Sequence, residues 1–264
     1  MRLKRAFGYH QVPELDPFLL LDDFHSDNEQ DYMAGFPWHA HRGIETITYM
    51  LRGRVEHGDS IGNGGIIQSN EVQWMTAGSG IIHQEMPKGP GLLWGFQLWA
   101  NLPASQKMMA PRYRDVKANM IPVAKPANGV EVKVICGEVA GVRGPVRDIV
   151  IDPQFLDVML DPGAIFSHTV QDEHNVFAYV VEGSGKFEET EQSATGVENV
   201  ILFGKGNEVK VQASDGGVRF LLVSGRPLKE PVAWYGPIVM NTQEELRIAF
   251  EEYEKGTFIK AEKR

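Results

Sequence analysis

Two short patterns in the sequence pair residues that can bind a metal ion. His39 and His41 stand two positions apart, and His83 and Glu85 repeat that spacing farther along the chain. Side chains at i and i+2 of a strand point to the same face, about 6.5 Å apart, so each pair can converge on one ion. Three imidazole nitrogens and one carboxylate oxygen suit iron, nickel, copper, manganese or zinc, whereas magnesium and calcium take oxygen ligands. The residues therefore predict a transition-metal site.

The spacing alone leaves the carboxylate ligand undecided between two residues. If the strand that carries His41 continues regularly, Glu45 falls on the same face as the histidines. Glu85 follows His83 on the same face of a second strand. A single histidine on a strand is most often a hydrogen-bonded core or surface residue, but three together beside glycines in a β-rich chain favour a metal site.

The remaining histidines are interpreted differently. His57, in the run VEHGDS, is expected to be a structural hydrogen-bonding residue rather than a fifth ligand. His168 and His174 lie six positions apart, and neither has a second histidine two residues away. The second half of the chain is therefore expected to hold no metal.

Aromatic residues flank the histidine motifs. Phe36, Trp38, Trp74 and Phe96 could line a pocket for a flat substrate, with Met75 beside them. Packing in the interior of a β-barrel is the stronger expectation, because aromatic side chains dominate such cores.

The elements that must position these residues are strands. The chain contains 28 Gly and 15 Pro, which divide it into short runs rich in Val, Ile, Phe and Trp. Such runs separated by turn residues are typical of all-β sandwiches and barrels. Strands are predicted at 44–51, 66–68, 93–99, 130–136, 155–160, 175–181, 209–212 and 218–223.

One helix is predicted, over 242–255 near the C-terminus. Thr242 and Glu245 fit a capping box, and Leu246, Phe250 and Tyr253 follow at helical spacing. We expect these three side chains to pack the helix on the outside of the second barrel.

A Pro-rich stretch divides the chain. Closely spaced Pro and Gly between residues 120 and 129 discourage both helix and central strand. The prediction is an N-terminal metal-binding barrel over 1–122, a linker over 123–129, and a C-terminal barrel without metal over 130–264. The phrases YMLRGRVEHGD and YVVEGSGKFEE show a faint likeness between the two halves.

The overall composition narrows the classes of molecule that the protein could bind. A formal net charge of −9 and a pI near 5.4 disfavour direct binding to nucleic acids and to anionic membranes. No segment approaches the roughly 18 apolar residues of a membrane helix, and no signal peptide is recognisable. Cys136 is the single cysteine, which suits a reducing compartment. We therefore expect a cytoplasmic protein.

The motifs carry a resemblance to a known family. HxH-xxx-E followed by G-xx-H is similar to the two motifs of the cupin superfamily. The longer strings FPWHAHRGIETITYMLRGRVEHGDSIGNGG and VQWMTAGSGIIHQEMP resemble the pirin family, as do DPFLLLDDF near the N-terminus and GPIVMNTQEELRIAFEEYEKGTF near the C-terminus. The resemblance spans nearly the whole chain and implies an all-β bicupin, with two jelly-roll barrels and a short C-terminal α-helix.

The resemblance also implies a ligand set. In pirins the carboxylate comes from the second motif, so the ligands carried over are His39, His41, His83 and Glu85. Glu45 then becomes a group that orients a ligating imidazole or a polar residue of the barrel wall.

The activity implied by the resemblance is cleavage of flavonols such as quercetin by O₂ with release of CO. One divalent transition metal is expected, with Fe(II) as the first choice and Ni, Cu, Mn, Co or Zn as alternatives. Glu85 would act as the base that accepts the proton of the flavonol 3-hydroxyl. The alternative is a non-enzymatic, iron-containing regulatory protein that binds a transcriptional or metabolic protein partner.

Overall fold

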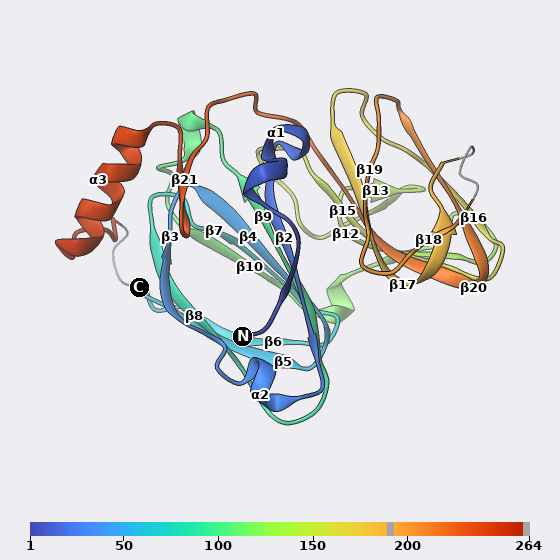
Figure 1. Ribbon diagram of the computed structural model, residues 1–264, viewed down its shortest axis with the longest axis horizontal. Coiled ribbons are helices and arrows are strands. Elements are labelled where there is room, and N and C mark those ends of the chain that lie inside the picture. Colours follow the sequence, from blue (N-terminus) through green and yellow to red (C-terminus); the bar gives the residue numbers. More distant parts are fainter. Residues whose placement is uncertain (189–192, 261–264) are drawn as a thin grey trace. The chain divides into compact units, whose positions relative to one another are not determined.

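The computed structural model describes residues 1–188 and 193–260 of the chain (Figure 1). These residues form two compact units. The first unit combines residues 1–9, 18–118 and 228–264, and the second combines 10–17 and 119–227. No helix in the described ranges is long and apolar enough to cross a bilayer.

The first unit consists of antiparallel strands with two helices. Its elements are β1 (Lys4–Phe7), β2 (Phe18–Ser26), α2 (Glu29–Tyr32), β3 (Phe36–His41), β4 (Ile44–Arg52), β5 (Arg54–Asp59), β6 (Gly64–Gln68), β7 (Val72–Thr76), β8 (Ile81–Pro87), β9 (Leu93–Asn101), β10 (Arg112–Val116), β21 (Ala233–Tyr235), β22 (Ile238–Met240) and α3 (Gln243–Glu254).

Two sheets of this unit build its barrel. One has the order β1-β2-β9-β4-β7-β10 and the other β3-β8-β5-β6, with every pair antiparallel. Side chains of the two sheets meet inside, since Thr48 of β4 bonds to Glu85 of β8. The predicted ligands therefore lie on one wall of the barrel, facing the opposite sheet.

The second unit is built around one long strand. Its elements are α1 (Val12–Leu15), β11 (Val123–Ala124), β12 (Val130–Cys136), β13 (Glu138–Val139), β14 (Val142–Arg143), β15 (Gln154–Leu160), β16 (Ile165–Thr169), β17 (Asn175–Lys186), β18 (Thr195–Gly196), β19 (Val200–Leu202) and β20 (Glu208–Gly225).

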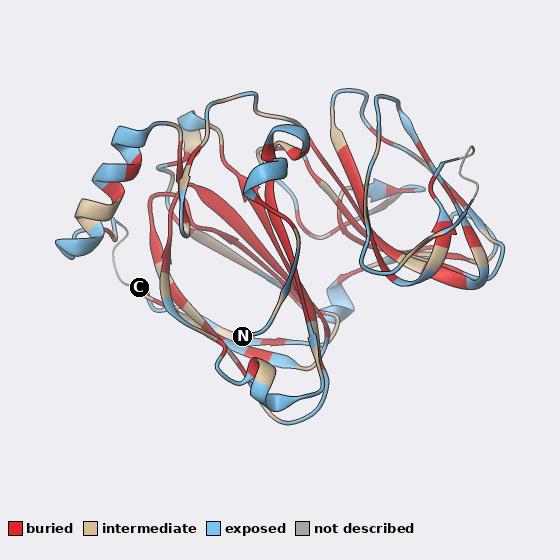
Figure 2. Ribbon diagram, viewed as in Figure 1, coloured by how far each residue is buried: buried red, intermediate tan, exposed pale blue. Residues whose placement is uncertain are grey.

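In the main sheet of the second unit, β20 pairs with β16 through its first half and with β15 through its second half. It also pairs with β17 over most of its length. The interior is apolar: Val132, Leu156, Val158 and Phe220 are among the buried residues of one continuous cluster. Figure 2 shows this burial along the strands of the unit.

The sequence predicted the strands well. The eight expected runs all fall within strands of the structure. The helix is confirmed as α3, with both hydrogen bonds of the capping box between Thr242 and Glu245. Gly256, at a φ of +70°, follows its end, a conformation that favours glycine.

The placement of the C-terminal segment differs from the prediction. Residues 228–264 belong to the first unit, not to the second barrel. Ile238 and Met240 of β22 and Leu246 and Ala249 of α3 share a buried cluster with Ala40 of β3. The apolar face of α3 is buried against β3, the strand that carries His39 and His41.

The predicted linker is also only partly correct. Val123 and Ala124 form β11, which pairs with Val132 and Lys133 of β12. Ala124 is fully buried there. The structure thus places these two residues in the second unit's sheet, because an edge strand tolerates the nearby prolines.

Candidate metal centre

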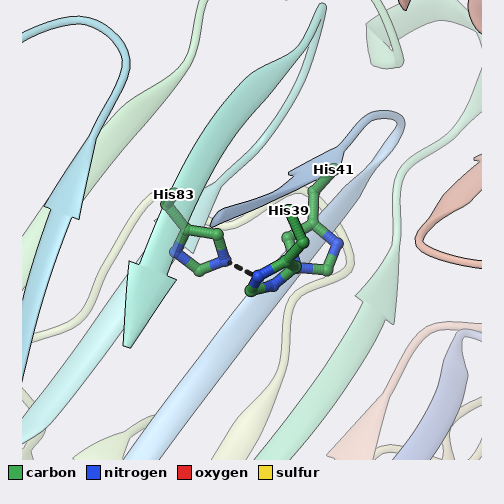
Figure 3. Close-up of side chains that lie close together, drawn as sticks. All are labelled: His39, His41 and His83. Carbon is green, nitrogen blue, oxygen red and sulfur yellow. Dashed lines mark hydrogen bonds between the residues drawn. The ribbon is translucent and has the colours of Figure 1, made fainter. Parts of the chain in front are cut away.

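Three histidines meet because β3 and β8 pair in antiparallel register. His39 lies directly opposite His83, and His41 lies opposite Ile81 on the same face. Direct cross-strand partners share a face, so the i, i+2 spacing predicted from the sequence brings all three imidazoles to one point. The prediction that His39, His41 and His83 converge is confirmed (Figure 3).

The imidazoles meet through their Nε2 atoms. His39 Nε2 lies 2.9 Å from His41 Nε2 and 3.0 Å from His83 Nε2. The three rings pack edge to face or tilted, with centroids 4.4 to 5.0 Å apart. These three residues form the single close group of potential metal ligands in the described part of the chain.

Backbone carbonyls determine the tautomers of two rings. His39 Nδ1 lies 2.8 Å from the carbonyl oxygen of Pro37, and His41 Nδ1 lies 3.1 Å from that of Pro237. A carbonyl oxygen only accepts hydrogen bonds, so each Nδ1 carries the hydrogen and each neutral ring has a lone pair on Nε2. The two lone pairs then point toward a common position, where one metal ion could bind both.

Burial keeps the inner imidazoles neutral. His41 and His83 are almost completely buried, whereas His39 is half-buried. Burial lowers the pKa of both His41 and His83 well below 6.5, and the neighbouring imidazoles lower it further. Neutral imidazole is the form that binds metal ions.

The spacing of the nitrogens fits a transition metal. Two nitrogens about 2.1 Å from one ion are about 3.0 Å apart at a right angle and about 3.4 Å apart in a tetrahedral set. The separations of 2.9 and 3.0 Å from His39 correspond to right angles. Three nitrogens could hold one ion and would leave positions for other ligands.

Glu85 faces the same interior but lies outside the histidine group. Its Oε1 accepts a hydrogen bond from Thr48 Oγ1 (2.9 Å), and its Oε2 accepts one from Gln97 Nε2 (2.9 Å). The carboxylate is buried, and both donors come from the opposite sheet. These bonds hold the carboxyl group on the face of β8 that also carries His83, and its role as fourth ligand stays a prediction.

Glu45 points away from the histidines. The chain turns between β3 and β4 at Gly43, which has a φ of +78°, and β4 belongs to the other sheet. Glu45 Oε1 accepts a hydrogen bond from Thr76 Oγ1, and Oε2 accepts one from Trp74 Nε1 (3.0 Å). The expectation that regular parity would bring Glu45 to the ligand face is wrong, because the strand is interrupted. Burial raises the pKa of this wall residue.

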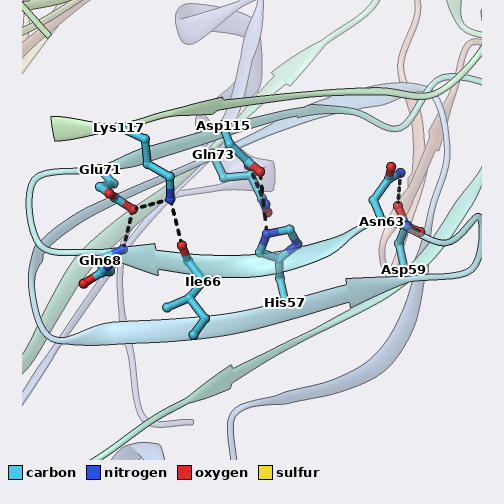
Figure 4. A network of polar contacts seen from close by, with 9 residues as sticks. All are labelled: His57, Asp59, Asn63, Ile66, Gln68, Glu71, Gln73, Asp115 and Lys117. Carbon is cyan, nitrogen blue, oxygen red and sulfur yellow. Dashed lines mark hydrogen bonds and ion pairs between the residues drawn. The ribbon is translucent and has the colours of Figure 1, made fainter. Parts of the chain in front are cut away.

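His57 takes part in a polar network at the far end of the barrel interior (Figure 4). It lies opposite Glu85 in the pairing of β5 with β8, and its Nε2 is 4.0 Å from Asp115 Oδ2. Gln73 Nε2 donates to Asp115 Oδ1 (3.1 Å). Burial lowers the pKa of His57, against the opposing effect of Asp115. His57 lies outside the histidine group, and its role as a structural hydrogen-bonding residue stays a prediction.

The predicted aromatic residues divide between two environments. Phe36 contacts the His39 ring, with centroids 6.4 Å apart, and Trp38 is exposed beside it. Trp74 and Phe96 are fully buried in the six-stranded sheet, and Trp74 donates to Glu45. Met75 is likewise fully buried. Packing therefore accounts for Trp74, Met75 and Phe96, and only Phe36 and Trp38 lie beside the histidines.

The C-terminal segment completes the site, which sequence reasoning did not foresee. The segment supplies the Pro237 carbonyl that contacts His41. It also supplies the Phe258 carbonyl, which accepts a hydrogen bond from Arg42 Nη2 (2.8 Å), while Arg42 Nε donates to Ser79 O (2.7 Å). Lys107 Nζ donates to the carbonyl oxygens of Gly43 (2.9 Å) and Val239 (3.0 Å). These two buried basic side chains bind the segment to the loop after His41, and burial lowers the pKa of Lys107 to about 7.

Thr48 and Gln97 were also missed. Each is a buried polar residue within an apolar strand, and that contrast was the available signal. No local pattern indicates the role of the Pro237 carbonyl, because it lies far from His41 in the sequence.

The second unit shows no comparable arrangement. His168 Nε2 is hydrogen-bonded to Gln154 Oε1 (2.8 Å), and His174 Nε2 lies 3.9 Å from Asp152 Oδ2. Burial lowers the pKa of both imidazoles. Within residues 1–188 and 193–260, neither histidine joins a group of metal ligands.

Comparison with known proteins identifies the family. Residues 1–100 match the family model described as Pirin, and residues 155–259 match the Pirin C-terminal cupin domain. A pirin-like protein of Caulobacter vibrioides is 44% identical over 261 residues, which are 98% of this chain and 93% of the relative. The chain belongs to the pirin family. The predicted all-β bicupin fold is thereby confirmed.

Two solved structures and a further relative are also similar to this chain. A crystal structure of quercetin 2,3-dioxygenase from Acinetobacter baumannii aligns with a TM-score of 0.87 and 33% identity, covering 97% of this chain and 91% of that one. A Pseudomonas aeruginosa relative, provisionally named quercetin 2,3-dioxygenase, is 41% identical over 97% of this chain and 91% of its own length. A bacterial pirin of Escherichia coli, solved with nickel(II), shares the fold at 22% identity and a TM-score of 0.64, covering 81% of this chain and 84% of that one.

Proposed function

We propose that this pirin is a metal-dependent dioxygenase that cleaves flavonols such as quercetin with O₂ and releases CO. The observation that carries the proposal is the convergence of three Nε2 lone pairs, two of them directed by backbone carbonyls. The likeness to a quercetin 2,3-dioxygenase over nearly the whole chain supports the choice of substrate.

His39, His41 and His83 would hold one divalent transition metal, with Glu85 as the fourth protein ligand. Fe(II) is the first choice, and Ni, Cu, Mn, Co or Zn fit the same donor atoms. When bound, the ion supplies a Lewis acid for the 3-hydroxylate of the flavonol and open positions for oxygen chemistry. His39, as the half-buried member, marks the side from which substrate reaches the site.

Glu85 would accept the proton of the flavonol 3-hydroxyl. Thr48 donates a hydrogen bond to one carboxylate oxygen and Gln97 donates one to the other, which fixes the plane of the group. The carboxylate is buried, so water does not compete for the same position. Deprotonation makes the flavonol ring electron-rich enough to react with O₂.

The test is turnover by protein loaded with one equivalent of Fe(II). We expect loss of the visible absorbance of quercetin together with O₂ uptake and CO release, above a control with free metal. Glu85→Gln should lower kcat by about 10²–10⁴-fold, the usual contribution of a general base, after its metal content has been matched to the parent.

Glu45→Gln is the matched control. It removes the charge of a buried carboxylate that bonds to Trp74 and Thr76 rather than to the histidine group, so metal content and turnover should stay at the parental level. Loss of metal in Glu45→Gln with retention in Glu85→Gln would reverse the assignment of the carboxylate. Metal-replete parent protein without O₂-dependent flavonol loss would leave the regulatory, partner-binding function instead.

A further inference from the structure

A row of aromatic rings leads from the surface of the first unit to one of the three histidines. Tyr9 and Trp234 have ring centroids 5.7 Å apart, and Trp234 and Trp99 are 5.9 Å apart. Trp99 meets His41 edge to face at 5.0 Å and 88°. Each ring contacts the next, so the row is continuous.

Exposure changes in one direction along this row. Tyr9 is 60% exposed, Trp234 is half-buried, and Trp99 is 9% exposed beside the buried His41. The four residues come from the N-terminal segment, β21, β9 and β3, and all belong to the first unit. One end of the row therefore meets solvent and the other meets a proposed metal ligand.

Packing alone does not require these residue types. Phenylalanine would also give aromatic contacts between neighbouring rings. Tyrosine and tryptophan add a property that phenylalanine lacks, since phenol and indole rings lose a single electron far more readily. The indole N–H groups are retained by hydrogen bonds, from Trp99 Nε1 to Gln97 Oε1 (3.4 Å) and from Trp234 Nε1 to Gly236 O (2.7 Å).

We infer that Trp99, Trp234 and Tyr9 form an electron-transfer route between the surface and the histidine site. The inference rests on the proposed metal centre and adds a second activity to it. When an oxidant reacts at the site without substrate, the route supplies an electron from the surface, so that the histidines and Trp99 are spared oxidation.

The reaction balances with hydrogen peroxide as the oxidant. Reduction of one H₂O₂ to two waters consumes two electrons and two protons. An iron(II) ion held by the three histidines would supply one electron. The Tyr9 phenol gives the other through Trp234 and Trp99, releases its proton to solvent, and becomes a neutral tyrosyl radical. Solvent supplies both protons, and the proton released by Tyr9 returns one of them, so that one proton is consumed overall. A soluble one-electron, one-proton reductant such as ascorbate then restores the phenol.

The experiment treats the iron(II)-loaded, full-length protein anaerobically with one equivalent of H₂O₂ and no flavonol, followed by freeze-quench EPR. The parent should show a tyrosyl radical that ascorbate removes. Tyr9→Phe should lose this signal and show a tryptophan radical instead. Trp99→Phe should lose both signals and accumulate oxidised histidine at position 39, 41 or 83, detected by peptide mass spectrometry.

Trp94→Phe is the matched control. Trp94 lies on the same strand β9 as Trp99 but stacks on His25, with centroids 4.2 Å apart and planes at 6°, and it does not touch the row. Its replacement should leave the tyrosyl signal unchanged. If Trp99→Phe binds iron poorly, Trp234→Phe interrupts the row one ring farther from His41 and should abolish the tyrosyl signal.

The outcomes separate this inference from the proposed function. Iron content and flavonol turnover are measured on the same samples, so absence of bound iron refutes the metal centre itself. A parent that binds iron but forms no tyrosyl radical, or a Trp234→Phe variant that forms it at the parental yield, overturns the electron route and leaves the metal centre intact.

Discussion

The two β units have antiparallel sheets in common but differ in what fills them. The first unit turns His41, His83, Glu85 and Gln97 into its barrel, all of them buried. The second unit fills the equivalent space with valine, leucine and phenylalanine. Alternation along a strand determines only which residues point inward, so the chemistry of each barrel depends on the residue types at those positions.

The two interiors also differ in the contacts that stabilise them. The polar groups around the histidines have partners in Thr48, Gln97 and the carbonyls of Pro37 and Pro237. The apolar cluster of the second unit is stabilised by close packing. The site of the first unit therefore depends on polar contacts between distant residues, such as that of His41 with the Pro237 carbonyl.

The largest effect that separates the units is on metal binding. His83→Ala removes one of three converging nitrogens, and the metal content of the purified protein should fall from close to one ion per chain to nearly none. His168→Ala, in the second unit, should leave the content unchanged. Elemental analysis of both variants decides the point, and full occupancy in His83→Ala would refute the proposed ligand set.

In the second unit, removal of a buried aromatic ring should lower the stability of the fold. Phe220 is fully buried and packs against Phe166 and Phe187. Phe220→Ala should lower the free energy of unfolding by about 3–5 kcal/mol, through lost burial and the cavity left behind. Urea titration measures the change, and the exposed Ile165→Ala serves as the control. A loss below that of the control would contradict the packed apolar core.

Acidification should weaken the metal-free first unit. The unfolded chain has histidine pKa values near 6.5, whereas burial lowers the pKa of His41 and His83 well below that value in the folded chain. Below pH 6.5 the unfolded state therefore binds more protons, and the free energy of unfolding falls as the pH falls. The slope is at most about 1.4 kcal/mol per pH unit for each histidine.

Urea titrations of metal-free protein at pH 7.5 and 5.5 measure this slope. The double variant His41→Asn and His83→Asn should show a smaller loss between the two pH values, because it lacks both buried bases. The same loss as in the parent would mean that other groups cause the acid sensitivity.

The smallest expected effect concerns the helix that closes the first unit. Thr242 accepts a hydrogen bond from the Glu245 amide in the capping box of α3. Thr242→Ala should lower stability by about 1 kcal/mol. Gln243→Ala, at the exposed first helical residue, should change little. Thermal unfolding of the two variants compares them, and an equal effect of both would remove the cap as a source of stability.

The sequence by itself determined the local features of this protein. The i, i+2 pairs identified His39, His41 and His83 as convergent, because strand parity depends only on the neighbouring backbone. The capping box identified α3 for the same reason, since its hydrogen bonds join residues three positions apart. The short apolar runs likewise located seven of the strands, with 209–212 and 218–223 both lying in β20.

Only the tertiary structure decided the direction of Glu45 and the position of the C-terminal segment. Gly43 ends one strand and lets the next join a different sheet, which turns Glu45 away from the site. The return of residues 228–264 to the first unit places the Pro237 carbonyl against His41 and Trp234 against Trp99. Contacts between residues so far apart in the sequence arise from packing of whole elements, and no local periodicity records them.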